Sequence, residues 1–423
     1  MTAAPVPSPR PTPSSPRPSG GDAALKQRVH RRLVAAGGLD PVDHLDQHDR
    51  AGRALAVRAR LAELLRDEAP LLTPARFEHL LRDLTDEVSG LGPLEPLLAD
   101  PEVSEVMVNG PGKAYVERAG RLEAVGIDLD APGIVRVVER VVAPLGLRLD
   151  RASPMVDARL VDGSRLHALI PPLAIDGPCV TIRRFRPRPV DLDAFGAEGA
   201  PGEFLRWTVI AGWNLLVSGG TSAGKTTLLN SLSGAIPSGE RVVTIEETAE
   251  LRLAQPHVVR LEARPPNAEG AGAVSVRDLV RTSLRMRPDR IVVGEVRGGE
   301  ALDMLQALNT GHDGSLSTVH ANGPGDALAR LETLVLIAGA GLPLLAVRSQ
   351  IGAAIDAVVH VTRSGQGARR VEAIGELGSG HADALGVRPL FERAGGALVP
   401  TGVPTRPPRR SGTPPPDVRW FAC

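Results

Sequence analysis

The sequence predicts an α/β protein with two folded domains between proline-rich tails, and three observations support this. In the second half of the chain, short apolar segments alternate with helical ones, which is typical of a mostly parallel sheet. In the first half, helical periodicity gives way to strand-like alternation, which indicates a smaller α+β domain. Finally, 423 residues are enough for two domains and tails.

Changes in composition set the expected domain boundaries. Residues 1–21 are rich in proline and serine and cannot bury enough apolar surface to fold, so we expect a disordered tail. We assign residues 22–187 to the N-terminal α+β domain and residues 188–380 to the second domain. A tail-like composition returns near Thr401, so we expect residues 381–423 to form a largely disordered C-terminal extension.

Both domains contain segments with clear periodicity. In the first domain, apolar residues recur at helical spacing from Leu25 to Leu84, and strand-like segments follow. The strands expected there are residues 105–108, 114–117, 168–170 and 180–185. The strands expected in the second domain are residues 213–218, 241–246, 257–262, 290–294 and 315–319.

Charge and composition argue against several classes of protein. Lysine plus arginine and aspartate plus glutamate both number 49, so the formal net charge is zero and nothing indicates a nucleic-acid binder. A bilayer span needs about 18 consecutive apolar residues, and no such run is present. The N-terminus lacks the apolar core of a secretory signal. Cys179 and Cys423 lie far apart without metal-ligand spacing, which suits a reducing cytoplasm.

The most informative segment is a glycine-rich loop with the pattern Gly219-x4-Gly224-Lys225-Thr226. An apolar strand precedes it and an amphipathic helix follows, so its N–H groups should cradle phosphate oxygens at the helix N-terminus. We expect Lys225 to contact the phosphates and Thr226 to bind Mg²⁺. The nucleotide-binding set is Gly219, Gly220, Thr221, Ser222, Ala223, Gly224, Lys225, Thr226 and Thr227. The alternative, a glycine turn that binds no phosphate, does not account for the flanking strand and helix.

Carboxylates follow two of the expected strands. Glu295 stands at the end of one, directly after Gly294, where nucleotide hydrolases usually place an aspartate that holds Mg²⁺ through water. Another strand runs into an acidic cluster that starts at Glu246, and phosphoryl transfer needs a group to orient the attacking water. Glu250 is the candidate for that role, with Glu246 and Glu247 nearer the metal. The alternative is that the cluster caps a helix or solvates a loop.

His312 and His320 bracket a short apolar strand. We assign His320 a catalytic role, because a histidine near the γ-phosphate can hydrogen-bond an oxygen and report whether hydrolysis has occurred. A zinc site made of His312, Asp313 and His320 would lack a fourth ligand. A structural, hydrogen-bonded histidine is the alternative for each position.

Arginines cluster in the first domain, where Arg159 and Arg165 are followed by Arg183 and Arg184. An arginine placed against the transition state of phosphoryl transfer is worth on the order of 10³–10⁵ in rate. The alternative is that these arginines form salt bridges and solvated surface charge.

These motifs together resemble the type II/type IV secretion ATPases and, within them, the Tad/Flp pilus-assembly ATPases. The resemblance runs from about residue 92 to about residue 376. It rests on PLEPLLADPEVSEVMVNGP, VDARLVDGSRLHALIPP, VTIRRF, GGTSAGKTTLLN, TIEETAEL, LRMRPDRIVVGEVRG and TGHDGSLSTVHAN.

The resemblance implies a plan and a set of partners. The plan is an N-terminal domain joined flexibly to a RecA-like ATPase domain, assembled as a hexameric ring. The implied cofactors are ATP and Mg²⁺. The implied location is cytoplasmic, peripheral at the inner face of the cell membrane, with an inner-membrane platform protein of a pilus or secretion machine as partner.

The resemblance also assigns roles to individual residues. Lys225 matches the phosphate-loop lysine and Glu295 the atypical strand glutamate, while Glu247 stands where aspartate is common. The catalytic set is Glu250, Glu295, Lys225, Arg165, Arg183, Arg184 and His320. The Mg²⁺ set, partly through water, is Thr226, Glu246 and Glu295.

The sequence therefore favours a hexameric ATPase that hydrolyses ATP to power Tad/Flp-type pilus assembly or protein secretion. The alternative is the ATPase of a conjugation apparatus that moves DNA or effectors, with the same catalytic residues. A DNA-dependent recombinase or helicase would share the RecA-like core, but aromatic residues make up only 2%, so DNA binding is not expected. A non-hydrolysing nucleotide sensor would have no use for Glu250, and no LSGGQ-like signature of an ABC engine is present.

Overall fold

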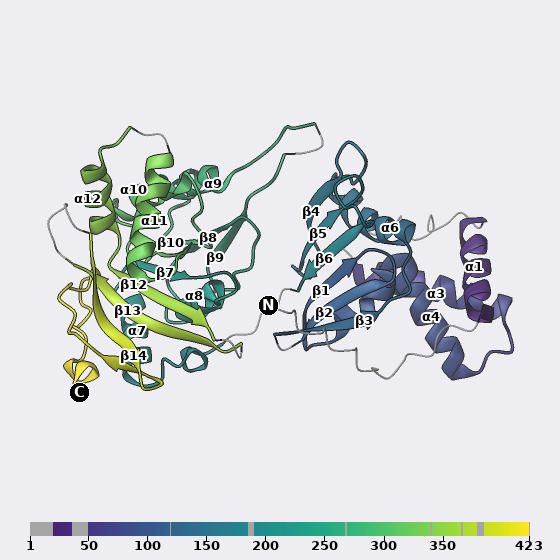
Figure 1. Ribbon diagram of the computed structural model, residues 1–423, viewed down its shortest axis with the longest axis horizontal. Coiled ribbons are helices and arrows are strands. Elements are labelled where there is room, and N and C mark those ends of the chain that lie inside the picture. Colours follow the sequence, from purple (N-terminus) through teal and green to yellow (C-terminus); the bar gives the residue numbers. More distant parts are fainter. Residues whose placement is uncertain are drawn as a thin grey trace, which may run out of the picture. The chain divides into compact units, whose positions relative to one another are not determined.

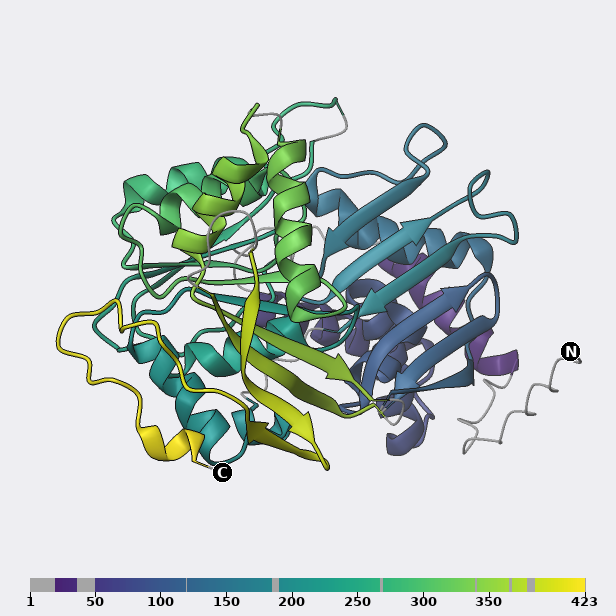
Figure 2. The same cartoon turned by 60° about the vertical axis from the view of Figure 1, so that its left-hand side comes forward.

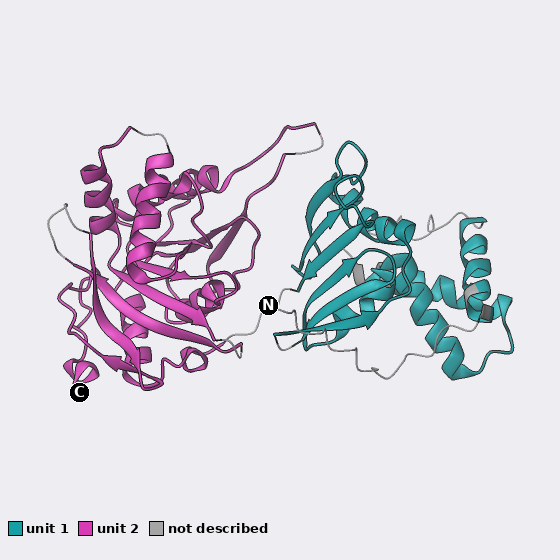
Figure 3. Ribbon diagram, in the orientation of Figure 1, with its two compact units in different colours: residues 1–185 teal, residues 186–423 magenta. Residues whose placement is uncertain are grey.

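The chain folds into two compact units, residues 1–185 and residues 186–423, which are described separately (Figure 3). The structure is a computed structural model. It describes residues 20–35, 50–118, 120–184, 190–266, 269–338, 341–364, 367–378 and 385–422. The expected N-terminal tail lies outside these residues except for its last two, which begin helix α1. Among the described helices, none is both long and apolar enough to cross a membrane.

The described part of the first unit opens with three helices, as the apolar spacing predicts. They are α1 (Gly20–Ala35), α3 (Arg50–Glu68) and α4 (Pro74–Ser89). Their buried faces form a core of their own, which includes Val29, Leu61, Leu65 and Leu84. This helical bundle is therefore stabilised by burial of its own apolar stripes.

The rest of the first unit is a six-stranded antiparallel sheet in the order β3-β2-β1-β6-β5-β4 (Figure 1). Its strands are β1 (Val103–Asn109), β2 (Lys113–Arg118), β3 (Arg121–Gly126), β4 (Met155–Arg159), β5 (Arg165–Leu169) and β6 (Cys179–Arg183). Short helix α5 (Glu95–Ala99) precedes the sheet and helix α6 (Ala131–Val142) follows β3. Alternate strand residues such as Val106, Val116 and Ile182 share a core with Ile134 and Val138 of α6. The intervening strand residues therefore lie on the other face of the sheet.

The second unit contains a nine-stranded sheet in the order β15-β14-β13-β12-β7-β11-β10-β8-β9. Five strands confirm the segments expected from the sequence: β7 (Leu215–Gly219), β8 (Val242–Glu246), β9 (Val258–Glu262), β10 (Arg290–Val293) and β11 (Leu316–His320). These five and β12 (Ala357–Arg363) are parallel. The remaining strands, β13 (Arg369–Leu377), β14 (Val387–Ala394) and β15 (Ala397–Pro400), extend the sheet in antiparallel fashion.

Helices cover both faces of this sheet (Figures 1 and 2). One face carries α7 (Ala200–Ile210) and α8 (Lys225–Ser233). The other carries α9 (Val276–Ser283), α10 (Glu300–Leu308), α11 (Pro324–Ile337) and α12 (Leu344–Ala354). Because successive residues of a strand point to opposite faces, Leu215 and Val217 lie in the first core and Leu216 in the second.

The expectation that residues 381–423 are largely disordered is wrong for the part of them that the structure describes. Strands β14 and β15 belong to the sheet, and residues 401–422, the C-terminal strap, run along the second unit (Figure 2). Strap carbonyls accept hydrogen bonds from two indole N–H groups: Pro414 from Trp207 at 2.9 Å and Pro407 from Trp213 at 3.0 Å. Near the end of the strap, Phe421 is buried against the ring of Phe204. The proline-rich composition of the strap predicted disorder, because the partners that stabilise it lie in a distant part of the sequence.

Candidate functional site

The phosphate loop lies between β7 and α8, as the sequence predicts. β7 ends at Gly219 and α8 begins at Lys225. Gly224 has a φ of 99°, a left-handed conformation that favours glycine. A Cβ at Gly219 would collide with the carbonyl oxygen of Val361, whereas one at Gly220 would meet only open space. The loop is thus packed against strand β12 on one side and open at Gly220, next to the N-terminus of α8.

Lys225 is buried and turned back onto the loop. Its Nζ donates to the carbonyl oxygens of Gly219 at 3.2 Å and Gly220 at 3.0 Å. It also lies 3.2 Å from Nε2 of His320, a residue at the end of β11. Since β11 pairs with β7 and His320 lies opposite Gly219 in that register, the sheet itself brings the predicted lysine and histidine together.

His320 links the lysine to the strand glutamate. Its Nε2 lies 2.9 Å from Oε1 of Glu295. Burial and the charge of Lys225 lower the pKa of His320, although Glu295 acts in the opposite direction. A neutral imidazole can accept a hydrogen bond from the lysine. The Glu295 Oε1 atom is buried, and within the described residues it makes no hydrogen bond of good geometry, although it lies close to the His320 ring.

Arg297 is a site residue that the sequence reasoning missed. It donates to Oε2 of Glu295 at 2.9 Å and also pairs with Glu247. This arginine therefore joins the strand glutamate to the acidic cluster after β8. Its position directly after the Gly294-Glu295-Val296 segment was the signal that could have identified it.

Glu246 holds the backbone of the acidic cluster in place through hydrogen bonds. It ends β8, is 4% exposed, and its carboxylate accepts hydrogen bonds from the backbone N–H of Glu250 at 2.8 Å and of Leu251 at 3.0 Å. Burial raises the pKa of Glu246 to about 7. A Cβ at Gly294 would lie 2.7 Å from the Cγ atom of Glu246, which explains why glycine stands where an aspartate was expected. In this geometry Glu246 fixes the backbone that carries Glu250. The metal-binding role predicted for Glu246 stays a prediction.

The other predicted residues of this unit fall into two groups. Thr226 and Thr227 occupy the first turn of α8 and are partly buried, as is Glu250. His312 lies before β11 and not at its end, and its Nδ1 is 2.9 Å from the carbonyl oxygen of Ala307. Because the two histidines lie at opposite ends of one strand, they do not share a site.

The predicted arginines of the first unit separate into two environments. Arg183 on β6 lies opposite Arg165 on β5, and Arg165 lies opposite Arg159 on β4. We call Arg159, Arg165 and Arg183 the arginine row; Glu105 on β1 continues it at one end. Arg184 instead donates to the carbonyl oxygens of Val103, at 3.0 Å, and Asp100. The structure thus assigns Arg184 to holding the turn between α5 and β1.

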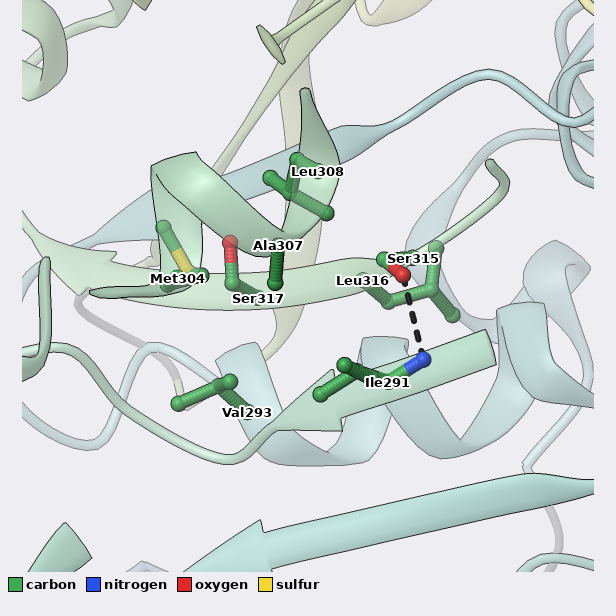
Figure 4. Close-up of a pocket in the computed structure, with 8 residues that line it drawn as sticks. All are labelled: Ile291, Val293, Met304, Ala307, Leu308, Ser315, Leu316 and Ser317. Carbon is green, nitrogen blue, oxygen red and sulfur yellow. Dashed lines mark hydrogen bonds between the residues drawn. The ribbon is translucent and has the colours of Figure 1, made fainter. Parts of the chain in front are cut away.

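A small pocket lies between β10, β11 and α10 (Figure 4). Most of its lining is apolar, and it consists of Ile291, Val293, Met304, Ala307, Leu308, Ser315, Leu316 and Ser317. It does not include the phosphate loop, so it is a packing defect of the core and not part of the candidate site.

Comparison with known proteins finds one family and several relatives. The family described as Type II/IV secretion system protein matches residues 87–383. A Mycobacterium tuberculosis protein named as a candidate for conjugal transfer is 44% identical over 308 residues, covering 70% of this chain and 87% of the relative. The conjugal transfer protein TrbB of Rhizobium radiobacter is 36% identical over 305 residues, covering 70% and 90%. The solved ATPase DotB of Legionella pneumophila has a TM-score of 0.50 and 20% identity, covering 69% and 81%, which supports the fold alone.

Proposed function

This chain belongs to the type II/IV secretion system protein family, and we propose that it is a hexameric ATPase that powers Tad/Flp-type pilus assembly or protein secretion. The observation that carries the proposal is the contact series from Lys225 through His320 to Glu295, built on adjacent parallel strands around a phosphate loop. Secretion ATPases of this family work with envelope machinery. We therefore propose an inner-membrane platform protein as partner and a cytoplasmic, peripheral location.

The residues present fit a Mg²⁺–ATP complex. The loop is open at Gly220, Lys225 lies against it, and a buried carboxylate oxygen of Glu295 has capacity for a further hydrogen bond. Thr226 in the first turn of α8 would hold the metal, with Glu295 acting through water. When bound, Mg²⁺ would neutralise charge on the transferred phosphoryl group.

The chain's own residues would then share the work of hydrolysis. Lys225 would exchange its loop carbonyls for phosphate oxygens. Glu250, held by Glu246, would orient the attacking water, and His320 would contact the oxygens of the terminal phosphate. We propose that Arg165 and Arg183 of the arginine row also bind nucleotide phosphates, because guanidinium groups suit these anions. Arg184 is left out of this set because its guanidinium is bound to backbone carbonyls.

The test is ATP turnover per protomer in Mg²⁺ over a wide range of protein concentration. We expect turnover that rises with concentration, because a ring completes its sites by assembly, and a loss of at least about 100-fold in Lys225→Ala. Wild-type turnover in Lys225→Ala would refute the assigned site. A rate per protomer that stays constant with concentration would refute the ring.

A second function is favoured by the names of the relatives, two of which refer to conjugal transfer. In that case the same ATPase would serve an apparatus that moves DNA or effectors. The two functions separate in the native host when Lys225→Ala replaces the wild-type chain. Loss of surface fibres or of a secreted protein supports the first, and loss of plasmid transfer alone supports the second.

A further inference from the structure

A β-hairpin from the C-terminal part of the sheet lies next to the phosphate loop. Strand β12 pairs in parallel with β7, with Val361 opposite Gly219, the first residue of the loop. The hairpin continues beyond this point, and Arg363 on β12 lies opposite Arg369 on β13. The sheet order therefore carries two arginines to the edge where the phosphate loop begins.

Both arginines are expected on the face of the hairpin that carries α8. Val361 and Val371, two residues away from Arg363 and Arg369, belong to the same core as Leu228 of α8. Because residues i and i+2 of a strand share a face, the arginines lie on the side of the sheet where α8 starts. The register therefore places two guanidinium groups on adjacent strands at the edge where the phosphate loop begins.

Arg369 lies directly against the loop. A Cβ on Gly224 would lie 2.6 Å from the Cδ atom of Arg369 and 3.3 Å from its Nε, so the side chain crosses the loop where glycine leaves room for it. Its Nη1 atom donates to the Thr227 hydroxyl at 3.4 Å. That distance is long for a hydrogen bond, and a guanidinium binds a charged oxygen more strongly than it binds a hydroxyl.

We infer that Arg369 is a nucleotide-binding residue that contacts the phosphates from the Thr227 side of the loop, opposite to the contribution of Lys225. The inference rests on the proposed function. Lysine in such a loop reaches the β- and γ-phosphates, whereas backbone groups cradle the α- and β-phosphates. Arg369 adds a positive charge beside Gly224 and Thr227. Because ADP and ATP both carry α- and β-phosphates, Arg369 would contribute to binding of either nucleotide.

The experiment compares Arg369→Gln with Arg370→Gln in the full-length protein. Arg370 is the adjacent exposed arginine, and it lies opposite Thr362, on the other side of the strand's alternation. The Kd of Mg²⁺–ADP and of Mg²⁺–ATP would be measured by calorimetry, and folding checked by circular dichroism. We expect Arg369→Gln to raise both Kd values about tenfold, as loss of one charge-assisted contact does. Arg370→Gln should leave them within about twofold.

Three results would have distinct meanings. Unchanged Kd values in Arg369→Gln would overturn the inference and leave the proposed function intact. Equal weakening in both variants would also overturn it, because the effect would then be one of general charge. If the wild-type protein bound neither nucleotide, the proposed function itself would fail.

Discussion

Two groups of arginines in this molecule behave in opposite ways, one in the C-terminal strap and one in the arginine row of the first unit. In the strap, Arg406 and Arg409 both bind the buried carboxylate of Asp356, at 2.9 and 2.6 Å. Arg410 binds Glu240 in the same way, at 2.8 Å between Nη2 and Oε2. Each of these three strap arginines thus meets an acidic side chain from a distant part of the chain.

In the arginine row, the cross-strand neighbours of Arg165 are two further arginines. Pairs of like charge across strands destabilise a sheet, whereas opposite charges stabilise it. The comparison shows that arginine content alone does not tell whether an arginine stabilises the fold or binds a ligand. An arginine matched to a buried carboxylate contributes to folding, whereas for the arginines of the row we propose phosphate binding.

The largest effect expected concerns turnover and the arginine row. Arg165→Gln combined with Arg183→Gln should lower ATP turnover by about 100-fold or more, because arginines at a transferred phosphoryl group have effects of that order. Unfolding followed by circular dichroism should show no loss of stability. Arg136→Gln, an exposed arginine on α6, is the control and should leave turnover unchanged. Normal turnover in the double variant would place the row with the structural arginines.

The next effect concerns stability and the strap. Arg409→Ala should lower the free energy of unfolding by about 3 kcal/mol, because it leaves buried Asp356 with one cation instead of two. Arg419→Ala is the control within the strap, since Arg419 is 87% exposed and pairs only locally with Asp417. Urea unfolding measures both variants. Equal stability of the two would mean that the contacts of Arg409 add nothing to the stability of the second unit.

The smallest effect extends the comparison to carboxylates. Burial, with help from Glu95 and Asp83, raises the pKa of Asp86 to about 6, against the action of Arg82. In Glu87, burial also acts to raise the pKa, but His30 and Lys26 lower it overall. Since Asp86 has a raised pKa when folded, its contribution to stability is complete below about pH 4 and lost as the pH rises through about 6.

Asp86→Asn should therefore gain stability relative to the wild type as the pH rises from about 4 to 7, by on the order of 1 kcal/mol after allowance for solvent screening. Thermal unfolding at several pH values would measure the difference. A difference independent of pH would show that Asp86 titrates as an ordinary aspartate.

Local patterns predicted the parts of this molecule that depend on local order. The five strands around the phosphate loop were found from apolar runs, and the proximity of Lys225, His320 and Glu295 follows from parallel strand ends meeting at one edge. The strap was not predicted, because its order depends on Asp356 and on indole groups that lie 207 and 194 residues away in sequence from the carbonyls they bind.

Two features of the site were not predicted, because they also depend on residues that are distant in sequence. The adjacent residues Arg183 and Arg184 looked equivalent in sequence, but strand alternation sends them to different surroundings, one in the arginine row and one at the Val103 carbonyl. The sequence also could not explain why glycine, and not aspartate, stands at position 294. The side chain of Glu246 occupies the space that a side chain at this position would fill.

The indole groups under the strap have an optical consequence. All three tryptophans, Trp207, Trp213 and Trp420, lie in the second unit, whereas the single tyrosine, Tyr115, lies in the first. Two of the indoles donate hydrogen bonds to strap carbonyls. Tryptophan emission therefore reports on the second unit and its strap, because the first unit contains no tryptophan. The chain carries a built-in fluorophore set that can follow one unit while the other changes.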